Sequence, residues 1–163
     1  MKRERPGSGQ ESVWDYPRPP ALELQAGEVR VEFAGELIAR SERAWRVLET
    51  SHPPTVYIPR EDVNMAFLHP VAGGQSRCEW KGAASYFDLR VGARLSSRAA
   101  WSYLKPTPAF AAIADALAFY PSRVDAAFIG EMRVTAQPGD FYGGWITPAV
   151  VGPFKGDPGT LGW

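Results

Sequence analysis

The chain has 163 residues, about the length of one domain. Its 18 basic and 18 acidic side chains cancel, so charge gives no strong signal for nucleic acid or an anionic membrane surface as a partner. Hydrophobic residues make up 45% of the sequence, which excludes a wholly disordered chain, and 16 Gly with 15 Pro favour short elements and turns over a helix bundle.

Cysteine and histidine usage limits the metal and disulfide chemistry. Cys78 is the only cysteine, so no intramolecular disulfide can form, and a cytoplasmic location is expected. His52 and His69 add only two more ligands of the kind that zinc prefers, so no zinc site is predicted and no metal ligand is assigned. A carboxylate site for magnesium stays open, although no acidic cluster with a recognisable spacing is present. The first residues lack the apolar run of a signal peptide, and no stretch of eighteen apolar residues predicts a membrane span.

The composition predicts three parts. Residues 1–27 are rich in Pro, Gly and Ser and are expected to form an extended arm, whose rings at Trp14 and Tyr16 dock onto the domain. Residues 28–136 are predicted to form a β domain. Residues 137–163 combine Gly and Pro with aromatic side chains, which disordered tails usually lack, so they are predicted to pack on the domain and cover a sheet edge.

The domain begins with strand patterns. Apolar and charged residues alternate over 29–33, and the Ala-Gly-Glu sequence that follows predicts a hairpin turn into residues 37–39. Further strands are predicted at 45–48 and 56–58. One helical turn is expected at 59–62, because a proline is followed by acidic residues.

The middle of the chain continues with β patterns. A strand is predicted at 65–68, a Gly-Gly loop at 71–76 and a long alternating region at 78–91. A hairpin partner is expected to continue through 99–104. Alternation places Phe87 and Leu89 on one face and Tyr86 on the other.

Residues 106–120 favour a helix by local propensity, because Thr107 and Pro108 resemble a helix start, whereas the run 116–120 reads equally well as a buried strand. A last hairpin is predicted over 124–130 and 131–136. The fold class is therefore mainly β: a compact antiparallel β-sandwich or barrel-like domain with one short helix and irregular N- and C-terminal extensions.

Three motifs resemble a known family. The sequence CEWKGAASY at residues 78–86, AWSYLKP at 100–106 and AFY at 118–120 resembles domain-of-unknown-function family 427. The resemblance implies a compact, mainly β domain of bacterial type and carries a nucleotidyltransferase-like label without an established activity. The matching positions are Cys78, Lys81, Gly82, Tyr86, Trp101, Tyr103, Pro106, Phe119 and Tyr120.

The candidate binding residues lie in and around these motifs. A lysine beside aromatic rings, here Lys81, binds phosphate or carboxylate, and Gly82 would let a ligand approach the backbone. A surface lysine at a β-bulge explains the same pattern. The rings either line a pocket for a flat ligand or fill the core. The aromatic candidates are Tyr57, Trp80, Tyr86, Trp101 and Tyr103, with Cys78 beside them.

Cys78 lies three positions before Lys81, so in an unbroken strand the two side chains point to opposite faces and Cys78 is a buried, inert residue.

We expect a domain that binds a small molecule or a nucleotide-like ligand, with no cofactor identified by the pattern. The first alternative is a metal-assisted, nucleotidyltransferase-like enzyme in which Asp88 or Glu61 holds a metal. The second is a structural or interaction module whose arm and tail mediate homo-oligomer assembly. No phosphate-binding glycine loop and no catalytic triad is present in the sequence.

Overall fold

The alternating segment at the start of the domain forms a hairpin. In the computed structural model, β3 (Val29–Phe33) pairs antiparallel with β4 (Glu36–Ser41), as the sequence predicts. Ala34 and Gly35 both have positive φ angles, 51° and 76°, the pattern of a two-residue turn whose twist matches the strands. The backbone N–H of Ala34 donates to the Asp125 carboxylate over 2.7 Å, which ties this turn to a distant part of the chain.

The structure describes residues 1–73, 76–78 and 80–163. Within this part the chain is mainly β, which confirms the predicted class, and its strands do not close into a barrel. The hairpin β3–β4 belongs to a four-stranded sheet that β12 (Ala126–Ile129) and β13 (Met132–Arg133) complete, so the hairpin predicted near residues 124–136 is confirmed.

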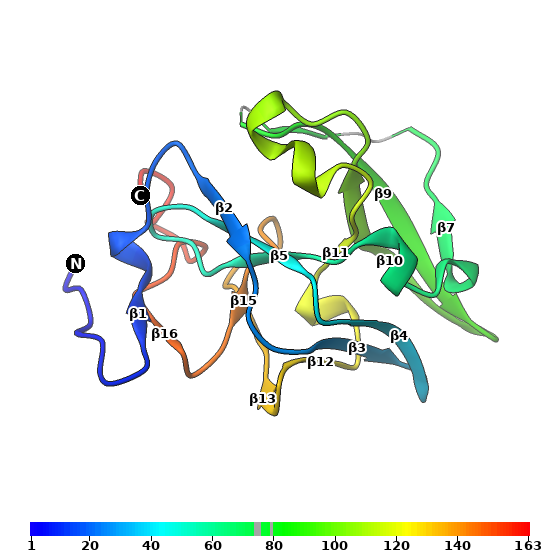
Figure 1. Ribbon diagram of the computed structural model, residues 1–163, viewed down its shortest axis with the longest axis horizontal. Helices are drawn as coiled ribbons and strands as arrows, with labels where there is room; N and C mark the ends of the chain where they lie inside the picture. Colours follow the sequence, from blue (N-terminus) through cyan, green and yellow to red (C-terminus); the bar gives the residue numbers. More distant parts are fainter. Residues whose placement is uncertain (74–75, 79) are drawn as a thin grey trace.

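A five-stranded sheet carries the longest strands. β9 (Gly82–Val91) and β10 (Arg94–Tyr103) form a long hairpin, and β11 (Ala118–Phe119) extends it beyond β10 (Figure 1). On the other edge of β9, two short strands pair with different parts of it. They are β7 (Leu68–Pro70) and β8 (Ser76–Cys78).

Three details of this region differ from the predictions. Met65–Phe67 is a 3-10 turn, η3, and the strand begins only at Leu68. The alternating region 78–91 is not one strand, because the chain turns between β8 and β9, and Cys78 pairs with Gly82 across that turn. The predicted loop 71–76 lies partly outside the described residues, and its last residue, Ser76, already belongs to β8.

Residues 106–120, for which a helix and a strand were both predicted, contain one element of each kind. Its first half forms η4 (Pro108–Ile113), which is 3-10 rather than α-helical, and Phe110 interrupts it with non-helical angles. Its second half contains the strand β11, buried on both faces. Proline at the first position starts the turn, and pairing with β10 determines the strand.

A three-stranded sheet stands beside the long hairpin. It contains β2 (Ala21–Leu24), β5 (Trp45–Leu48) and β6 (Thr55–Tyr57), so part of the sequence expected to be arm forms a sheet edge. Ile58 and Leu117 exchange two backbone hydrogen bonds of 2.8 Å, which link this sheet to β11.

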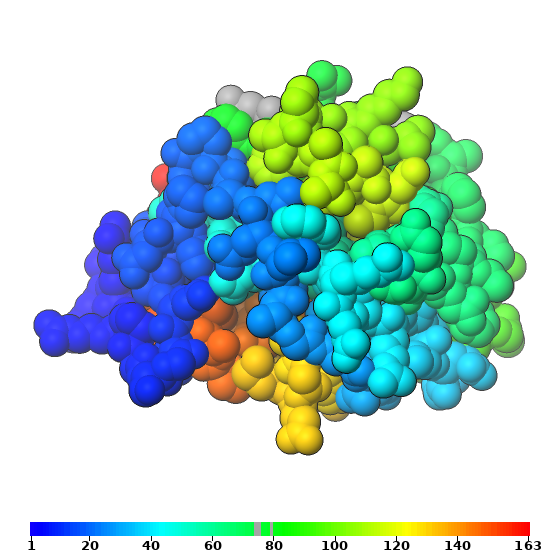
Figure 2. Space-filling model, viewed as in Figure 1, coloured from blue at the N-terminus to red at the C-terminus, as the bar shows by residue number. Residues whose placement is uncertain are grey.

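The two termini meet on one side of the molecule. β1 (Glu11–Ser12) pairs in parallel with β16 (Val150–Val151), and the blue arm lies beside the orange tail in Figure 2. The 3-10 turn η1 (Val13–Asp15) follows β1, and Tyr16 packs with Val150 in a small buried cluster.

The remaining short elements connect these sheets. η2 (Arg60–Asp62) is the helical turn predicted at 59–62, and η5 (Pro121–Arg123) follows β11. β14 (Thr135–Ala136) pairs with β15 (Trp145–Ile146), which belongs to the tail. No helix in the described residues has both the length and the apolar character needed to cross a membrane.

The two faces of the long hairpin belong to different hydrophobic clusters. Phe87, Leu89 and Ala100 face the main core, which the four-stranded sheet covers. Ala84, Trp101 and Tyr103 point to the opposite face and join a second cluster with residues of η4, β5 and β6. The second face is therefore where the aromatic motif residues gather.

Candidate functional site

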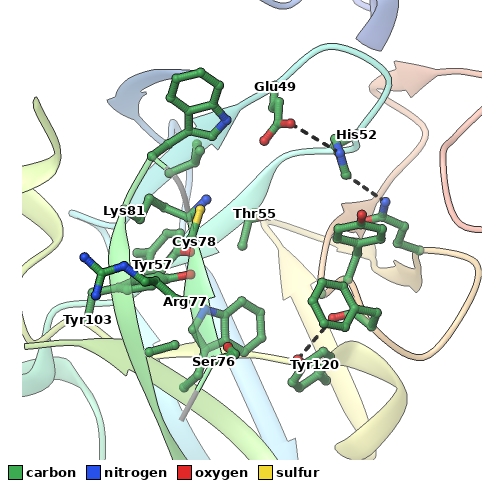
Figure 3. Close-up of a pocket in the computed structure, with 18 of the residues that line it drawn as sticks. Glu49, His52, Thr55, Tyr57, Ser76, Arg77, Cys78, Lys81, Tyr103 and Tyr120 are labelled. Carbon is green, nitrogen blue, oxygen red and sulfur yellow. Dashed lines mark hydrogen bonds and ion pairs between the residues drawn. The ribbon is translucent and has the colours of Figure 1, made fainter. Parts of the chain in front are cut away.

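A cavity of about 240 Å³ opens on the second face of the long hairpin (Figure 3). Its walls come from β5 and β6, from the hairpin β8–β9, from β10, and from the tail. The described residues that line it include Val47, Glu49, His52, Thr55, Tyr57, Ser76, Arg77, Cys78, Trp80, Lys81, Ala84, Tyr86, Trp101, Tyr103, Tyr120, Gln137, Phe141, Tyr142, Gly143 and Lys155.

Strand register gathers the rings. Tyr86 on β9 lies opposite Trp101 on β10, and Ala84 lies opposite Tyr103, so all four side chains share one face. The small side chain of Ala84 leaves space between larger neighbours. Tyr57, from β6, meets Trp101 edge to face with 6.3 Å between ring centroids. The predicted placement of Trp101 and Tyr103 on one face is therefore confirmed.

The turn between β8 and β9 brings Cys78 and Lys81 to the same cavity. Our expectation that they point apart assumed an unbroken strand, and the turn removes that condition. The Lys81 Nζ atom lies 5.9 Å from the centroid of the Tyr103 ring, and its side chain is half-buried. Cys78 is also half-buried and borders the cavity rather than lying fully inside the core.

Two neighbours of Lys81 have different roles. The backbone carbonyl of Trp80 accepts a hydrogen bond from Thr107, which attaches the turn to the segment before η4, and Trp80 lines the cavity. Gly82 does not line it. Gly82 has a φ of 100°, and a Cβ atom there would stand 3.2 Å from the Lys105 carbonyl oxygen, so a glycine is needed to start β9.

Sequence reasoning missed the polar wall of the cavity. Glu49 and His52 follow β5, whereas Gln137, Tyr142 and Lys155 come from the tail. The i,i+3 spacing of Glu49 and His52 was a weak local signal. Nothing local in the sequence predicted the tail residues, because they reach the cavity only through tertiary packing.

Hydrogen bonds and a ring contact order this wall. His52 Nε2 lies 3.5 Å from the carboxylate of Glu49, and His52 Nδ1 lies 3.0 Å from the amide nitrogen of Gln137. The ring of Tyr142 meets the imidazole edge to face at 4.7 Å. Burial, together with the nearby cations Lys155, Arg18 and Lys81, lowers the pKa of His52 to about 4, so the imidazole is neutral at pH 7.

Three buried phenols of the cavity, those of Tyr57, Tyr103 and Tyr120, stay protonated. Burial raises the pKa of Tyr120 to about 12 and also raises the pKa of Tyr103 and Tyr57. The hydroxyl of Tyr120 donates to the Phe141 carbonyl over 3.2 Å, and the hydroxyls of Tyr86 and Ser76 lie 2.6 Å apart. The walls therefore combine flat rings with neutral hydroxyl groups.

Positively charged side chains outnumber negatively charged ones among the described residues that line the cavity. Arg77, Lys81 and Lys155 are cationic, and Glu49 is the acidic side chain among the described lining residues. With His52 neutral, these groups carry a net positive charge. A low-dielectric, positively charged hollow favours anions over cations.

The residues considered for a metal lie elsewhere. The Asp88 carboxylate accepts a hydrogen bond from the backbone of Arg98, and Glu61 lies 3.8 Å from the Arg43 guanidinium. Neither borders the cavity. In the part of the chain that the structure describes, no group of three or more His, Cys, Asp and Glu side chains is arranged to hold a metal ion.

Comparison with known families agrees with the motifs around the cavity. The family model described as a domain of unknown function, DUF427, matches residues 21–130, which is more than half of the chain. The chain belongs to the DUF427 family. The match includes every strand from β2 to β12, whereas the tail residues of the polar wall lie beyond it. The search of curated proteins gave no match.

The DUF427 match thus separates two contributions to the cavity. The matched region supplies the aromatic wall, Lys81 and the pair Glu49 and His52. The tail of this chain adds Gln137, Tyr142 and Lys155. The family description itself names no activity.

Proposed function

We propose that this DUF427 protein binds a small anionic molecule with a flat ring in the cavity beside Lys81. One observation carries the proposal: aromatic side chains and three cations share a hollow of about 240 Å³. This volume lies just below the usual range of roughly 300 Å³ and more for ligand sites, which favours one ring system with its substituents over a large ligand.

The wall chemistry supports both properties of the ligand. Trp101, Tyr103 and Tyr57 offer faces and edges on which a flat ring can pack. Lys81 and Lys155 are half-buried, so their charges are less screened than those of fully exposed lysines. An anionic substituent that reaches either ammonium group would gain a charge-assisted hydrogen bond.

The rim adds exposed groups that a ligand can cover. Phe141 is 69% exposed although it lines the cavity, and Arg77 is exposed as well. Both side chains are therefore open to contact with a ligand that enters the cavity.

The test is a binding assay on the full chain. A panel of nucleoside monophosphates and aromatic carboxylates is titrated while tryptophan fluorescence and heat are recorded, because Trp80 and Trp101 line the cavity. We expect saturable binding of anionic ring compounds and weaker binding of their uncharged analogues.

Variants of two lysines test the site. Lys81→Met should raise the dissociation constant of the anionic compounds about tenfold, the size expected for one charge-assisted hydrogen bond. Lys105→Met is the matched control, since Lys105 is exposed and does not line the cavity. Equal effects of the two variants, or no saturable binding by any compound, would refute the proposal.

A further inference from the structure

The binding function proposed above gives no role to Glu49, the one acidic side chain among the described residues that line the cavity. Glu49 is half-buried, with its side chain 22% exposed, and it lines a hollow whose other charged walls are positive. An anionic ligand would be repelled by this carboxylate unless it also offered hydrogen-bond donors to it. The position of Glu49 therefore gives information about the ligand.

The backbone fixes the orientation of Gln137. Its Oε1 atom accepts a hydrogen bond from the Gly144 N–H over 3.1 Å, and its Nε2 atom donates to the Lys155 carbonyl over 2.8 Å. Exchanging the two ends of this amide would place oxygen against a carbonyl and nitrogen against an N–H group. Only one orientation of Gln137 satisfies both backbone groups.

The orientation of Gln137 sets the tautomer of His52. Because the Gln137 amide nitrogen donates, the Nδ1 atom of the neutral imidazole accepts, and the proton of His52 is on Nε2. The Nε2 atom faces Glu49 Oε2 at 3.5 Å. The hydrogen bond from Gln137 thus turns the N–H side of the neutral imidazole toward the Glu49 carboxylate.

One oxygen of Glu49 carries its contacts with the protein. Oε2 lies 3.3 Å from the Arg18 guanidinium as well as 3.5 Å from His52. Among the described residues, Oε1 has no hydrogen bond. An ionised carboxylate can only accept hydrogen bonds, so Oε1 remains available to a donor group of a ligand.

A tight turn holds Glu49 and His52 together. The His52 N–H donates to the Glu49 carbonyl over 3.0 Å, and Ser51 between them has a φ of 72°. A residue other than glycine in this left-handed region is uncommon and costs conformational energy, so it persists where the surrounding structure requires it. The turn gives the carboxylate a fixed place in the cavity wall.

We propose that Glu49 recognises a flat nitrogen heterocycle by its N–H edge, and that the ligand is a guanine-type ring with an anionic substituent. This inference rests on the binding function proposed above. A ring N–H and the amino group beside it are two adjacent donors that the two lone pairs of the free Oε1 atom can accept. The ring packs against the aromatic wall, and the anionic substituent reaches Lys81.

Three nucleotides that share a phosphate and a ribose differ in the hydrogen-bonding edge of the base, so they test whether Glu49 recognises that edge. Guanosine monophosphate offers a ring N–H and an amino group, inosine monophosphate offers the ring N–H alone, and adenosine monophosphate has a ring acceptor at that place. Calorimetric titration of the wild-type protein should rank them in this order. Guanosine monophosphate should bind at least about tenfold more tightly than adenosine monophosphate, as expected for hydrogen bonds to a charged group.

Glu49→Gln should abolish this ranking, because an amide presents one donor and one acceptor in place of two acceptors. Glu61→Gln is the matched control, since Glu61 is exposed and lies outside the cavity. If Glu49→Gln does not fold, the ranking by the wild-type protein still decides the question.

The outcomes separate the two proposals. Equal binding of the three nucleotides, or a ranking that Glu49→Gln leaves intact, overturns the role of Glu49 but keeps the anion site. If none of the three binds while aromatic carboxylates do, the guanine-type ligand is wrong and the anion site again stands. If no anionic ring compound binds, both proposals fail.

Discussion

Gly143 lies directly against the indole of Trp101. A Cβ atom at residue 143 would stand 2.2 Å from Cη2 and 2.7 Å from Cζ3 of that ring, far inside contact distance. Tyr120, whose ring also meets Trp101 with 4.5 Å between centroids, is the next neighbour. The absence of a side chain at residue 143 therefore lets the tail cross the aromatic wall of the cavity.

Gly143→Ala should push the tail away from Trp101. Overpacking of this kind costs about 1–3 kcal/mol, and the ring cannot retreat freely because Tyr57 and Tyr120 pack against it. We expect a lower free energy of unfolding in urea and altered tryptophan emission. Gly162→Ala is the control, because open space surrounds that glycine. Identical stability and emission of the two variants would contradict the close approach.

The tail also contributes to the main core. Trp145 is 1% exposed, and its indole N–H donates to the Phe119 carbonyl over 3.0 Å. Trp145→Phe leaves that buried carbonyl without its donor and leaves part of the indole volume empty, so the free energy of unfolding should fall by about 2–4 kcal/mol.

Trp163→Phe tests whether this loss is specific to Trp145. The ring of Trp163 meets only the edge of Trp14 among the ring contacts of the described chain, at 5.3 Å, and it is only partly buried. Urea unfolding should show a loss below about 1 kcal/mol for Trp163→Phe. A Trp145→Phe protein as stable as the wild type would show that the tail does not support the core.

The sequence was informative where the periodicity was local. Alternation at 29–33 predicted β3, and the alternation around Trp101 and Tyr103 predicted which face they share. The prediction from sequence was wrong where a turn interrupts an alternating pattern, as in residues 78–91. Between Cys78 and Gly82 the residues alternate well enough to suggest a strand, yet the positive φ of Gly82 and the pairing of β8 with β9 create a turn.

The cavity could be predicted only in part, for a related reason. Tyr86 and Trp101 belong to adjacent strands of one hairpin, so their meeting follows from register. His52 and Gln137 are 85 positions apart, and only the packing of the tail joins them. Local sequence patterns cannot predict a contact between residues so far apart in the chain.

The arm should depend on Arg46. Its guanidinium, with the side chain 16% exposed, binds the carboxylates of Glu11 and Glu23, which come from β1 and the edge strand β2. Although burial opposes it, the two carboxylates raise the pKa of Arg46, so the group remains charged. Arg46→Ala would leave both acids without their shared cation and should reduce stability by about 2 kcal/mol.

Limited proteolysis should show which part of the chain the loss of stability in Arg46→Ala affects. We expect faster cleavage within residues 1–27 of Arg46→Ala than of the wild type, because the arm loses its anchor. Arg40→Ala should behave like the wild type, since Arg40 is 64% exposed and its ion pair is with Glu28 on the surface. Cleavage at the wild-type rate in Arg46→Ala would show that the other contacts of the arm, such as the β1–β16 and β2–β5 pairings, retain it without Arg46.

The burial of His52 predicts a specific loss of stability in mild acid. The pKa of His52 is about 4 in the folded chain against an ordinary value of 6.5, so between these pH values the unfolded chain binds a proton that the folded chain does not. Stability therefore falls as the pH is lowered from about 6.5 toward 4. The contribution of this group amounts to about 2 kcal/mol by pH 5.

Urea unfolding at pH 7 and pH 5 measures this effect. His52→Gln should lose less stability than the wild type between the two pH values, by about 2 kcal/mol, because glutamine does not titrate. His69→Gln is the control, since His69 is exposed on β7 and should leave the wild-type difference unchanged. If His52→Gln keeps the full pH dependence, the imidazole is not held neutral by burial, and the assignment of its proton to Nε2, which requires a neutral ring, no longer follows.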